Sequence, residues 1–518
     1  MPATNGVSAR PTLSRSLVRS LAHQGEDRGI ELPRADVLDL PERAMQFGTG
    51  ALLRGLGDCF IDEANARGQF GGRIVMVGST GSGRDRRLNE QDGLYTLVVQ
   101  GLVDGAARRD CRVIASVSRA LAANSEWDAV LRAAESPALD LIFSNTTEVG
   151  IVLDEDDADA GPERGGESPR SFPAKLARVL LHRARHFQFA PARAPVVIPC
   201  ELIEDNGDRL RAIVSTLAQR WALEPQFVSW LGRVVFCNTL VDRIVPGAPS
   251  GEQARELDTT LGYEDAMLTV CEPYRLFAIQ GDDALRTRLA FADADRGIIV
   301  AEDIAPYRER KVRLLNGAHT SFVSLALLAG CTTVRDAVEH PVIGAFLRIV
   351  LFDEIVPSVS VPGAAQFAGE VMERFANPYL HHALWDITLQ GTAKLRVRVV
   401  PTILSYARRT SQSPRALALG FAGYLAFQRG DLHEKRRAGG AAVPPDAAAE
   451  AVRAHWSSAN EADLTTFVRH VCADQELWGA DLSAVPGFVG AVSEQLARIR
   501  QEGAVAAMTA LVGVTVCR

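Results

Sequence analysis

Short β-branched runs alternate with longer segments of helical spacing through the first half of the chain, and this alternation restricts the fold more than any other feature. The runs lie within residues 44–57, 73–80, 111–117, 139–152, 194–199 and 234–246. Strands separated by helices pair in parallel, because each helix returns the chain to the same end of the sheet. The sequence therefore predicts an α/β fold that begins with a Rossmann-type parallel sheet domain.

After about residue 260 the pattern becomes mostly helical. Helical spacing is found at residues 311–330, 334–352, 364–376, 414–429, 446–456 and 459–512. Because 518 residues are too many for one core, we divide the chain into three parts. These are a mobile leader at 1–35, a Rossmann-type dinucleotide-binding domain at 36–260 and a mostly α-helical substrate and catalytic domain at 261–518. Residues 154–170 are predicted to be a solvated loop and residues 438–446 a linker.

Composition excludes several kinds of partner. The formal net charge of −7 argues against a general nucleic-acid binder and gives no basic face for a membrane, so an anionic substrate needs a local basic pocket. No apolar run reaches about 18 residues, so no transmembrane helix is expected. The eight cysteines are scattered, which indicates free thiols and no zinc site. We expect a cytoplasmic protein without a metal that acts on a small molecule.

A Gly-x-Gly turn after the first run is the first candidate cofactor site. Glycines at 48 and 50 let the backbone approach a pyrophosphate at a helix N-terminus. A plain strand–turn–helix is the alternative, because Leu53 stands where the usual fingerprint has Gly or Ala. The candidate cofactor-binding residues of this turn are Phe47, Gly48, Gly50, Leu52 and Arg54.

Polar side chains follow two further runs at the end where doubly wound sheets bind ligands. The run at 139–152 delivers Asn145, Thr146 and Thr147, for which a simple polar turn is the alternative. The run at 73–80 ends at Ser79, without the acid that usually holds the ribose hydroxyls of NAD. NAD is the expected cofactor, and NADP stays open.

Residues 311–330 place three polar side chains on an otherwise apolar helix. At about 100° per residue, Lys311, Asn316 and His319 share a sector of roughly 140°. A lysine kept from water loses pKa and can exchange a proton near neutrality, while the amide and the imidazole can hold the same oxygen. The alternative is a snorkelling lysine, an asparagine that ends a helix and a satisfied core histidine.

Taken together, six motifs resemble the polyol-specific long-chain dehydrogenases, the mannitol dehydrogenase family. They are FGTGALLRG, SNTTEVG, CELIEDNG, FCNTLVDRIVPG, YRERKVRLLNGAHT and PRALALGFAGYLAFQRG. The resemblance implies metal-independent hydride transfer between a nicotinamide and a secondary alcohol carbon. By the family's Lys-x4-Asn-x2-His motif, Lys311 is the general acid/base, and Asn316 holds the alkoxide with His319 beside it. Asn206 matches a second alkoxide-holding asparagine, and Asp242 matches an acid that tunes the lysine.

Within this family, residues 374–401 are most similar to members that interconvert D-tagaturonate and D-altronate. Members that act on sugar alcohols carry an arginine eight residues before the lysine that corresponds to Lys394. Here that position is Asp386, so their hydroxyl-binding pattern does not apply to this chain. Candidates for the substrate carboxylate are His381, His382, Lys394 and Arg396, with surface basic residues beside a strand as the alternative. A fructuronate, mannonate or neutral polyol dehydrogenase, or a silent cofactor-binding protein, stays open. So does the oligomeric state.

Overall fold

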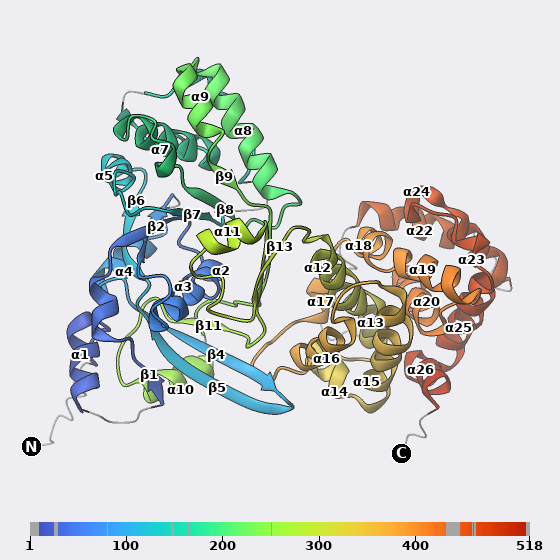
Figure 1. The fold of residues 1–518 in the computed structure, drawn as a ribbon. Helices are drawn as coiled ribbons and strands as arrows, with labels where there is room; N and C mark the ends of the chain where they lie inside the picture. The colour runs from blue at the N-terminus through green and yellow to red at the C-terminus, as the bar shows by residue number, and fades with distance from the viewer. Residues whose placement is uncertain are drawn as a thin grey trace, which may run out of the picture. The chain divides into compact units, whose positions relative to one another are not determined.

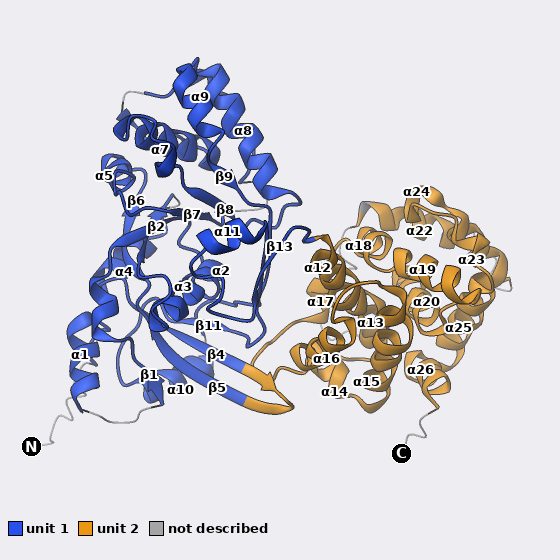
Figure 2. Cartoon of the chain, viewed as in Figure 1, with its two compact units in different colours: residues 1–100, 108–304 blue, residues 101–107, 305–518 orange. Residues whose placement is uncertain are grey.

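The computed structural model describes residues 10–24, 29–79, 81–146, 150–163, 166–249, 251–430, 446–457, 459 and 463–513. The chain forms two compact units, the first from residues 1–100 and 108–304 and the second from residues 101–107 and 305–518 (Figure 2). The boundary lies later than the predicted residue 260. Strands β11 (Thr269–Cys271), β12 (Leu276–Gln280) and β13 (Ile298–Ala301) pair within the first unit and hold the intervening chain there.

A six-stranded sheet forms the centre of the first unit, with the order β6-β3-β2-β7-β8-β9 (Figure 1). Neighbouring strands in this order all pair in parallel. In chain order this is 3-2-1-4-5-6, the arrangement of doubly wound dinucleotide-binding sheets, and the predicted Rossmann-type domain is confirmed. The strands are β2 (Glu42–Phe47), β3 (Arg73–Gly78), β6 (Val117–Ala122), β7 (Leu141–Ser144), β8 (Val196–Pro199) and β9 (Val235–Phe236).

Alternate residues of the sheet face two hydrophobic cores. Met45 and Phe47 of β2 lie in the core shared with helices α5 (Trp127–Ala133), α7 (Phe172–His186), α8 (Asn206–Arg220) and α9 (Pro225–Leu231). Ala44 lies in the core shared with α3 (Gly57–Ala66). Coverage on both faces explains why these strands read as continuous apolar runs.

Two smaller sheets complete the first unit. One has the order β1-β5-β4-β11, with β4 at Tyr95–Val103 and β5 at Ala106–Ile114, and the other has the order β10-β12-β13, with β10 at Thr239–Asp242. The remaining short helices are α2 (Ala51–Arg54), α4 (Arg84–Glu90), α6 (Glu155–Ala160), α10 (Gly251–Leu261) and α11 (Asp283–Arg288).

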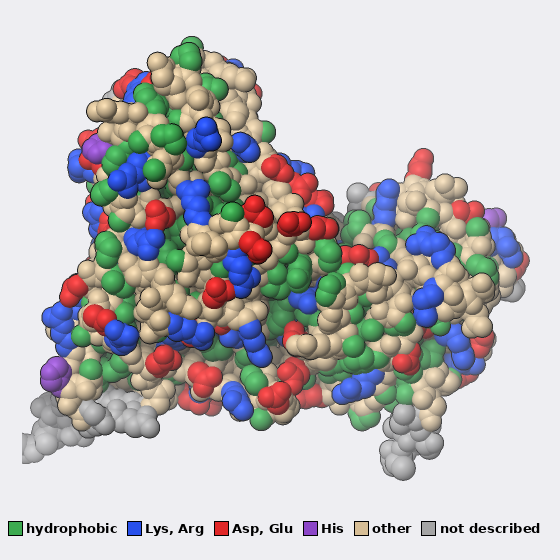
Figure 3. Space-filling view, viewed as in Figure 1, with side chains coloured by type: hydrophobic (Ala, Val, Ile, Leu, Met, Phe, Trp, Pro, Cys, Tyr) green, Lys and Arg blue, Asp and Glu red, His purple; other side chains and the backbone are tan. Residues whose placement is uncertain are grey.

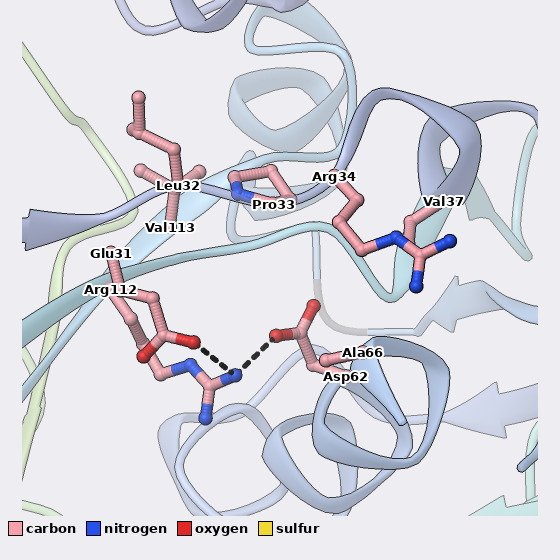
Figure 4. Close-up of a pocket in the computed structure, with 9 residues that line it drawn as sticks. All are labelled: Glu31, Leu32, Pro33, Arg34, Val37, Asp62, Ala66, Arg112 and Val113. Atoms are coloured by element: carbon pink, nitrogen blue, oxygen red, sulfur yellow. Dashed lines mark hydrogen bonds and ion pairs between the residues drawn. The ribbon is translucent and has the colours of Figure 1, made fainter. Parts of the chain in front are cut away.

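The predicted leader is wrong for its described part, because that segment packs on the first unit. Helix α1 (Arg15–Gln24) buries Val18 and Leu21, and strand β1 (Ile30–Glu31) pairs in parallel with β5. Beside β1 a cavity of about 190 Å³ separates this segment from α3. Figure 4 shows the Arg112 guanidinium between the carboxylates of Glu31, at 3.4 Å, and Asp62, at 3.1 Å. These ion pairs and the apolar contacts hold the segment in place.

The predicted loop at 154–170 contains a short helix, α6. The Asp154 side chain accepts a hydrogen bond from the Asp157 N–H and caps the first turn. Asp157 is buried, and its carboxylate accepts from the backbone N–H groups of Arg170 and Ser171. The acidic residues therefore cap and close this segment, a use that composition does not reveal.

The second unit is helical, as predicted. Its elements are α12 (Ala305–Arg310), the π-helix η4 (Lys311–Asn316), α13 (Gly317–Leu328), α14 (Val334–Glu339), α15 (Pro341–Arg348), the π-helix η5 (Ile349–Ile355), α16 (Ala364–Phe375), α17 (Leu384–Ile387), α18 (Gly391–Arg398), α19 (Val400–Thr410), α20 (Arg415–Arg429), α22 (Ala447–Ser457), α23 (Leu464–Ala473), α24 (Gln475–Trp478), α25 (Phe488–Glu502) and α26 (Ala504–Val512).

Helix α13 is buried on nearly every side and packs against α20. A Cβ on Gly420 would lie 2.4 Å from the Ser321 carbonyl oxygen, so glycine is needed for this close approach. The predicted helix at 334–352 is interrupted where His340 caps α15 and Pro341 begins it. Residues 391–398 are helical, which corrects the alternative of basic residues beside a strand. The predicted linker lies outside the described residues except for Asp446.

The surface agrees with the charge balance of the sequence. On the face drawn in Figure 3, acidic and basic side chains are interspersed on both units. Among the described residues, no helix has the length and apolar character that a membrane span requires.

Candidate active site

In the turn after β2, two glycines leave the backbone exposed at the carboxyl end of the sheet, without side chains to cover it. Gly48 has φ +113°, and a Cβ there would lie 2.6 Å from the Asn145 carbonyl oxygen. Only glycine fits this position. A Cβ on Gly50 would meet nothing within 4 Å, so the space beside it is open. This is the open glycine backbone that a pyrophosphate needs.

Three other candidates of this turn differ in where their side chains lie. Phe47 is buried, with its ring centroid 5.2 Å from that of Phe172. The Arg54 guanidinium is buried 5.8 Å from the ring centroid of Tyr95, and burial lowers its pKa. Leu52 is half-buried against the apolar core. Phe47 and Arg54 therefore support the turn from inside, and their side chains are not open to a cofactor.

Asn145 and Thr146 are held at the carboxyl end of β7 by the neighbouring strand. The Asn145 Nδ2 donates to the Cys200 carbonyl oxygen at 2.7 Å. The Glu201 carboxylate accepts from the Thr146 N–H and hydroxyl, both at 3.0 Å, and from the Ser144 hydroxyl at 3.1 Å. Burial raises the pKa of Glu201, against the effect of these donors. Thr147 lies outside the described residues.

Glu201 belongs to the CELIEDNG motif, and the sequence predicts no role for it, although its carboxylate holds this strand end. It is the second residue after β8, and a polar residue just after a strand is the signal that indicates Asn145 and Thr146 after β7. Applied equally to both strands, the rule about polar residues at carboxyl ends would have found it.

Ser79 is exposed at the end of β3 beside a cavity of about 260 Å³. The lining has small polar side chains, glycines and one carboxylate, and comprises Gly78, Ser79, Gly81, Ser82, Gly83, Asp85, Ala122, Asn124 and Ser125. In a Rossmann-type sheet the adenosine ribose lies at the end of this strand. Asp85 brings a carboxylate to this lining, later in the sequence than the acid of the usual pattern, and the neighbouring Arg84 is not part of the lining.

Asn206 has a different environment from the one expected of an alkoxide donor. It is fully buried, and its Nδ2 donates to Pro199 O at 3.0 Å, Glu201 O at 3.1 Å and Thr239 Oγ1 at 3.0 Å. Its Oδ1 accepts from the N–H groups of Gly207 and Thr239, each at 2.9 Å. Both amide protons are therefore used within the protein, and Asn206 joins the end of β8 to β10.

Asp242 ends β10 in the first unit. It is buried, and its backbone pairs with Leu276 of β12. The adjacent Arg243 is buried too and donates to the Glu272 carbonyl oxygen at 2.9 Å. The predicted influence of Asp242 on the lysine stays a prediction, because the two residues belong to different units.

Lys311 and Asn316 are the first and last residues of the π-helix η4. In an α-helix, residues five apart are separated by about 140° around the axis. A π-helix instead closes its hydrogen bonds at five residues, so these two positions lie about one turn apart on one face. The Gly317 N–H donates to the Val312 carbonyl oxygen five residues back, as a π-turn requires. Lys311 and Asn316 are both half-buried.

His319 lies one turn further along, among aromatic rings. Its ring centroid is 4.0 Å from Phe375, 5.2 Å from His382 and 6.2 Å from Phe322. Its Nε2 is buried without a hydrogen-bond partner in the described chain. Burial lowers the pKa of His319 well below its usual value, and the nearby His382, Arg374, Arg398 and Lys394 lower it further. Burial therefore favours the neutral imidazole, and Nε2 is left unpaired.

The four candidates for the carboxylate separate into two groups. His382 is beside His319, and Lys394 lies close enough to lower the pKa of both histidines. The Lys394 Nζ donates to the Ile387 carbonyl oxygen at 2.9 Å. In contrast, Arg396 is exposed and donates to the Glu476 carbonyl oxygen on α24 at 3.1 Å, and His381 is also exposed.

Thiols and metal-binding side chains do not form a second site in the part of the chain that the structure describes. Cys200 and Cys237 are buried, and burial raises the pKa of both thiols, which disfavours the reactive thiolate. No three His, Cys, Asp or Glu side chains of the described residues are grouped as metal ligands.

Comparison with known proteins matches both units. Residues 42–292 match the family model of the mannitol dehydrogenase Rossmann domain, and residues 303–500 match that of the mannitol dehydrogenase C-terminal domain. Altronate oxidoreductase of Bacillus subtilis (strain 168) is 40% identical over 465 residues, which cover 89% of this chain and 94% of that protein. Altronate oxidoreductase of Escherichia coli O157:H7 (strain EC4115 / EHEC) is 38% identical over 470 residues, which cover 89% and 95%.

Two solved structures share the fold along nearly the whole chain. Pseudomonas fluorescens mannitol 2-dehydrogenase, in a ternary complex with NAD and D-mannitol, has a TM-score of 0.66 and 23% identity, and the match covers 97% of this chain and 100% of that one. A substrate-free D-sorbitol dehydrogenase has a TM-score of 0.75 and 21% identity, with coverage of 96% and 100%.

Proposed function

Because this chain belongs to the mannitol dehydrogenase family, and is therefore a dehydrogenase acting on CH–OH groups, we propose that it interconverts D-tagaturonate and D-altronate with NAD as cofactor. The observation that carries this choice is the identity of 38–40% with altronate oxidoreductases across both units. The match to the solved mannitol and sorbitol dehydrogenases supports the fold alone.

The first unit supplies the cofactor site in this proposal. The open backbone at Gly50 and the close approach at Gly48 suit a pyrophosphate. At the adjacent strand end the Cys200 carbonyl oxygen holds Asn145, and the Glu201 carboxylate holds Thr146. When bound, the nicotinamide exchanges a hydride with the substrate carbon. Asp85 beside Ser79 favours NAD, since a carboxylate accepts ribose hydroxyls and repels a 2′-phosphate.

The second unit supplies the proton. In reduction, the protonated Lys311 amine donates a proton to the keto oxygen as it gains charge, and in oxidation the neutral amine removes the proton from the hydroxyl, without a metal. Asn316, on the same face of the π-helix, donates a hydrogen bond to this oxygen. An oxyanion donor of this kind typically contributes about 3–4 kcal/mol to the transition state. Neutral His319 orients a hydroxyl through its unpaired Nε2. Asn206 has no part in holding the alkoxide in this proposal, because its amide donates to Pro199 O, Glu201 O and Thr239 Oγ1.

A substrate panel tests the proposal. Initial rates with D-tagaturonate, D-fructuronate and D-fructose are measured with NADH and with NADPH at equal concentrations. We expect the highest kcat/KM for tagaturonate with NADH. Faster turnover of fructuronate or fructose would assign the chain to a neighbouring substrate, and absence of NADH oxidation with every keto-sugar and keto-acid would contradict the function.

A further inference from the structure

An arginine that the sequence analysis did not select lies unpaired among the cations of the second unit. Arg398 is the last residue of α18 and is half-buried. Its guanidinium makes no hydrogen bond or ion pair with any residue that the structure describes. Burial lowers its pKa, with no carboxylate to offset the effect. None of its nitrogens is among the buried side-chain atoms without a partner in the described chain, so its donors are accessible to a ligand.

The geometry of α18 directs this residue to the catalytic segment. Lys394 and Arg398 are four residues apart and share one face of the helix. The Arg398 carbonyl oxygen would lie 3.1 Å from a Cβ on Gly317, so this end of α18 packs against the segment between Asn316 and His319. Arg396, between them in sequence, reaches the Glu476 carbonyl oxygen on α24 instead.

The charged groups around His319 are mostly cationic. The pKa of His319 is lowered by four basic neighbours, Arg398, Lys394, Arg374 and His382. The Nε2 of this ring is unpaired. Two carboxylates oppose this effect on the neighbours: Asp386 raises the pKa of His382, and Asp446 raises the pKa of Lys394. Neither carboxylate affects the pKa of Arg398. The Arg398 guanidinium therefore carries a positive charge that no carboxylate of the described chain balances, and its donors are free.

We propose that Arg398 receives the carboxylate of the sugar-acid substrate and is the main determinant of acid over neutral sugar, with Lys394 and His382 beside it. The proposal rests on the proposed function. A guanidinium binds a carboxylate through two parallel hydrogen bonds, which fixes the orientation of the substrate as well as its charge. His319 Nε2 then remains for a hydroxyl of the same molecule.

Binding of D-altronate and of the neutral D-altritol to the enzyme–NADH complex tests this assignment by calorimetry. Arg398→Gln should weaken altronate binding about 10- to 100-fold, as expected for a lost charge-assisted hydrogen bond, and leave altritol binding within about twofold of wild type. The KM for tagaturonate should rise by a similar factor with a smaller change in kcat. Arg409→Gln, which removes an exposed arginine on α19, is the charge-matched control.

Arg398→Lys keeps the charge without the two-pronged geometry, and it should bind altronate with intermediate affinity. This variant also carries the test if Arg398→Gln does not fold. Wild-type altronate affinity in a folded Arg398→Gln, with normal tagaturonate turnover by the unmodified enzyme, would overturn the carboxylate site alone. An unmodified enzyme that neither oxidises altronate nor reduces tagaturonate would overturn the proposed function, and this proposal with it.

Discussion

Lys311 and Asn316 begin and end one π-helical segment, which places an amine and a carboxamide on the same face of a helix that would otherwise separate them. A π-helix has poorer hydrogen bonding than an α-helix, and such segments occur often at functional sites. The segment here joins two α-helices, α12 and α13. We interpret it as a device that brings the proton donor and the oxyanion donor to one atom of the substrate.

The two glycines of the first turn should respond differently to alanine. Gly48→Ala places a Cβ 2.6 Å from the Asn145 carbonyl oxygen at φ +113°, so we expect a loss of about 2 kcal/mol or more of unfolding free energy. Gly50→Ala meets no protein atom within 4 Å and should fold normally, but bind NADH more weakly. Urea unfolding and NADH fluorescence titration measure the two effects. Equal stability losses in both variants would contradict the assignment of the open space to a ligand.

Asn206 should prove to be a structural residue. Asn206→Ala removes donors to Pro199 O and Glu201 O and leaves the Thr239 N–H without its acceptor, so we expect the unfolding free energy to fall by about 2–4 kcal/mol. An alkoxide donor would behave in the opposite way, with a 10²- to 10³-fold lower kcat at unchanged stability. Thermal unfolding and kcat, measured on the same preparation, distinguish the two roles.

Glu354 should make the unfolding free energy of the second unit depend on pH. The residue is buried, and its carboxylate accepts from the N–H groups of Ala416 and Leu417 at the start of α20, both at 2.7 Å. Burial raises its pKa from 4.5 to about 7, against the effect of those donors. Between these values the unfolded chain releases its proton and the folded chain keeps it. The unfolding free energy should therefore fall as pH rises from about 4.5 to 7 and change no further above that.

Glu354→Gln should remove this part of the pH dependence. Asp58 and Asp62 also have raised pKa values, of about 7 and about 6, and are the same in both proteins, so the difference between variant and wild type isolates Glu354. Urea unfolding at pH 5 and pH 8 should show the variant gaining roughly 1–3 kcal/mol relative to the wild type at the higher pH. A difference that does not change with pH would show that Glu354 is ionised in the folded state across this range.

Much of the fold could be predicted from local pattern. Buried parallel strands such as Leu141–Ser144 read as short β-branched runs, and helices such as Arg415–Arg429 read by their spacing. Errors occurred where tertiary contacts overrode composition. The β-branched residues of Gly391–Arg398 form a helix, and the acidic segment near Asp157 is closed by its own caps. The domain boundary lies later than the sequence predicts, because the short strands after residue 260 pair with strands far away in sequence.

The candidate site was predictable in residue type more than in role. The motif with Lys311, Asn316 and His319 is local, so its spacing could be read directly, although an α-helical geometry was assumed where a π-helix occurs. The roles of Asn206 and Arg396 depend on carbonyl partners, Pro199 O and Glu476 O, that no spacing reveals. Arg398 could have been found as the residue one helical turn after Lys394, had that segment been interpreted as a helix.

The central claim is that the Lys311 amine exchanges the proton, and Lys311→Ala tests it most directly. Altronate oxidation by this variant should fall at least about 10²–10⁴-fold, while its NADH dissociation constant stays within about twofold of wild type. Added methylamine should restore part of the lost rate, because a free amine can take the place of the missing side chain. Turnover within a few-fold of wild type, without any response to methylamine, would contradict the account.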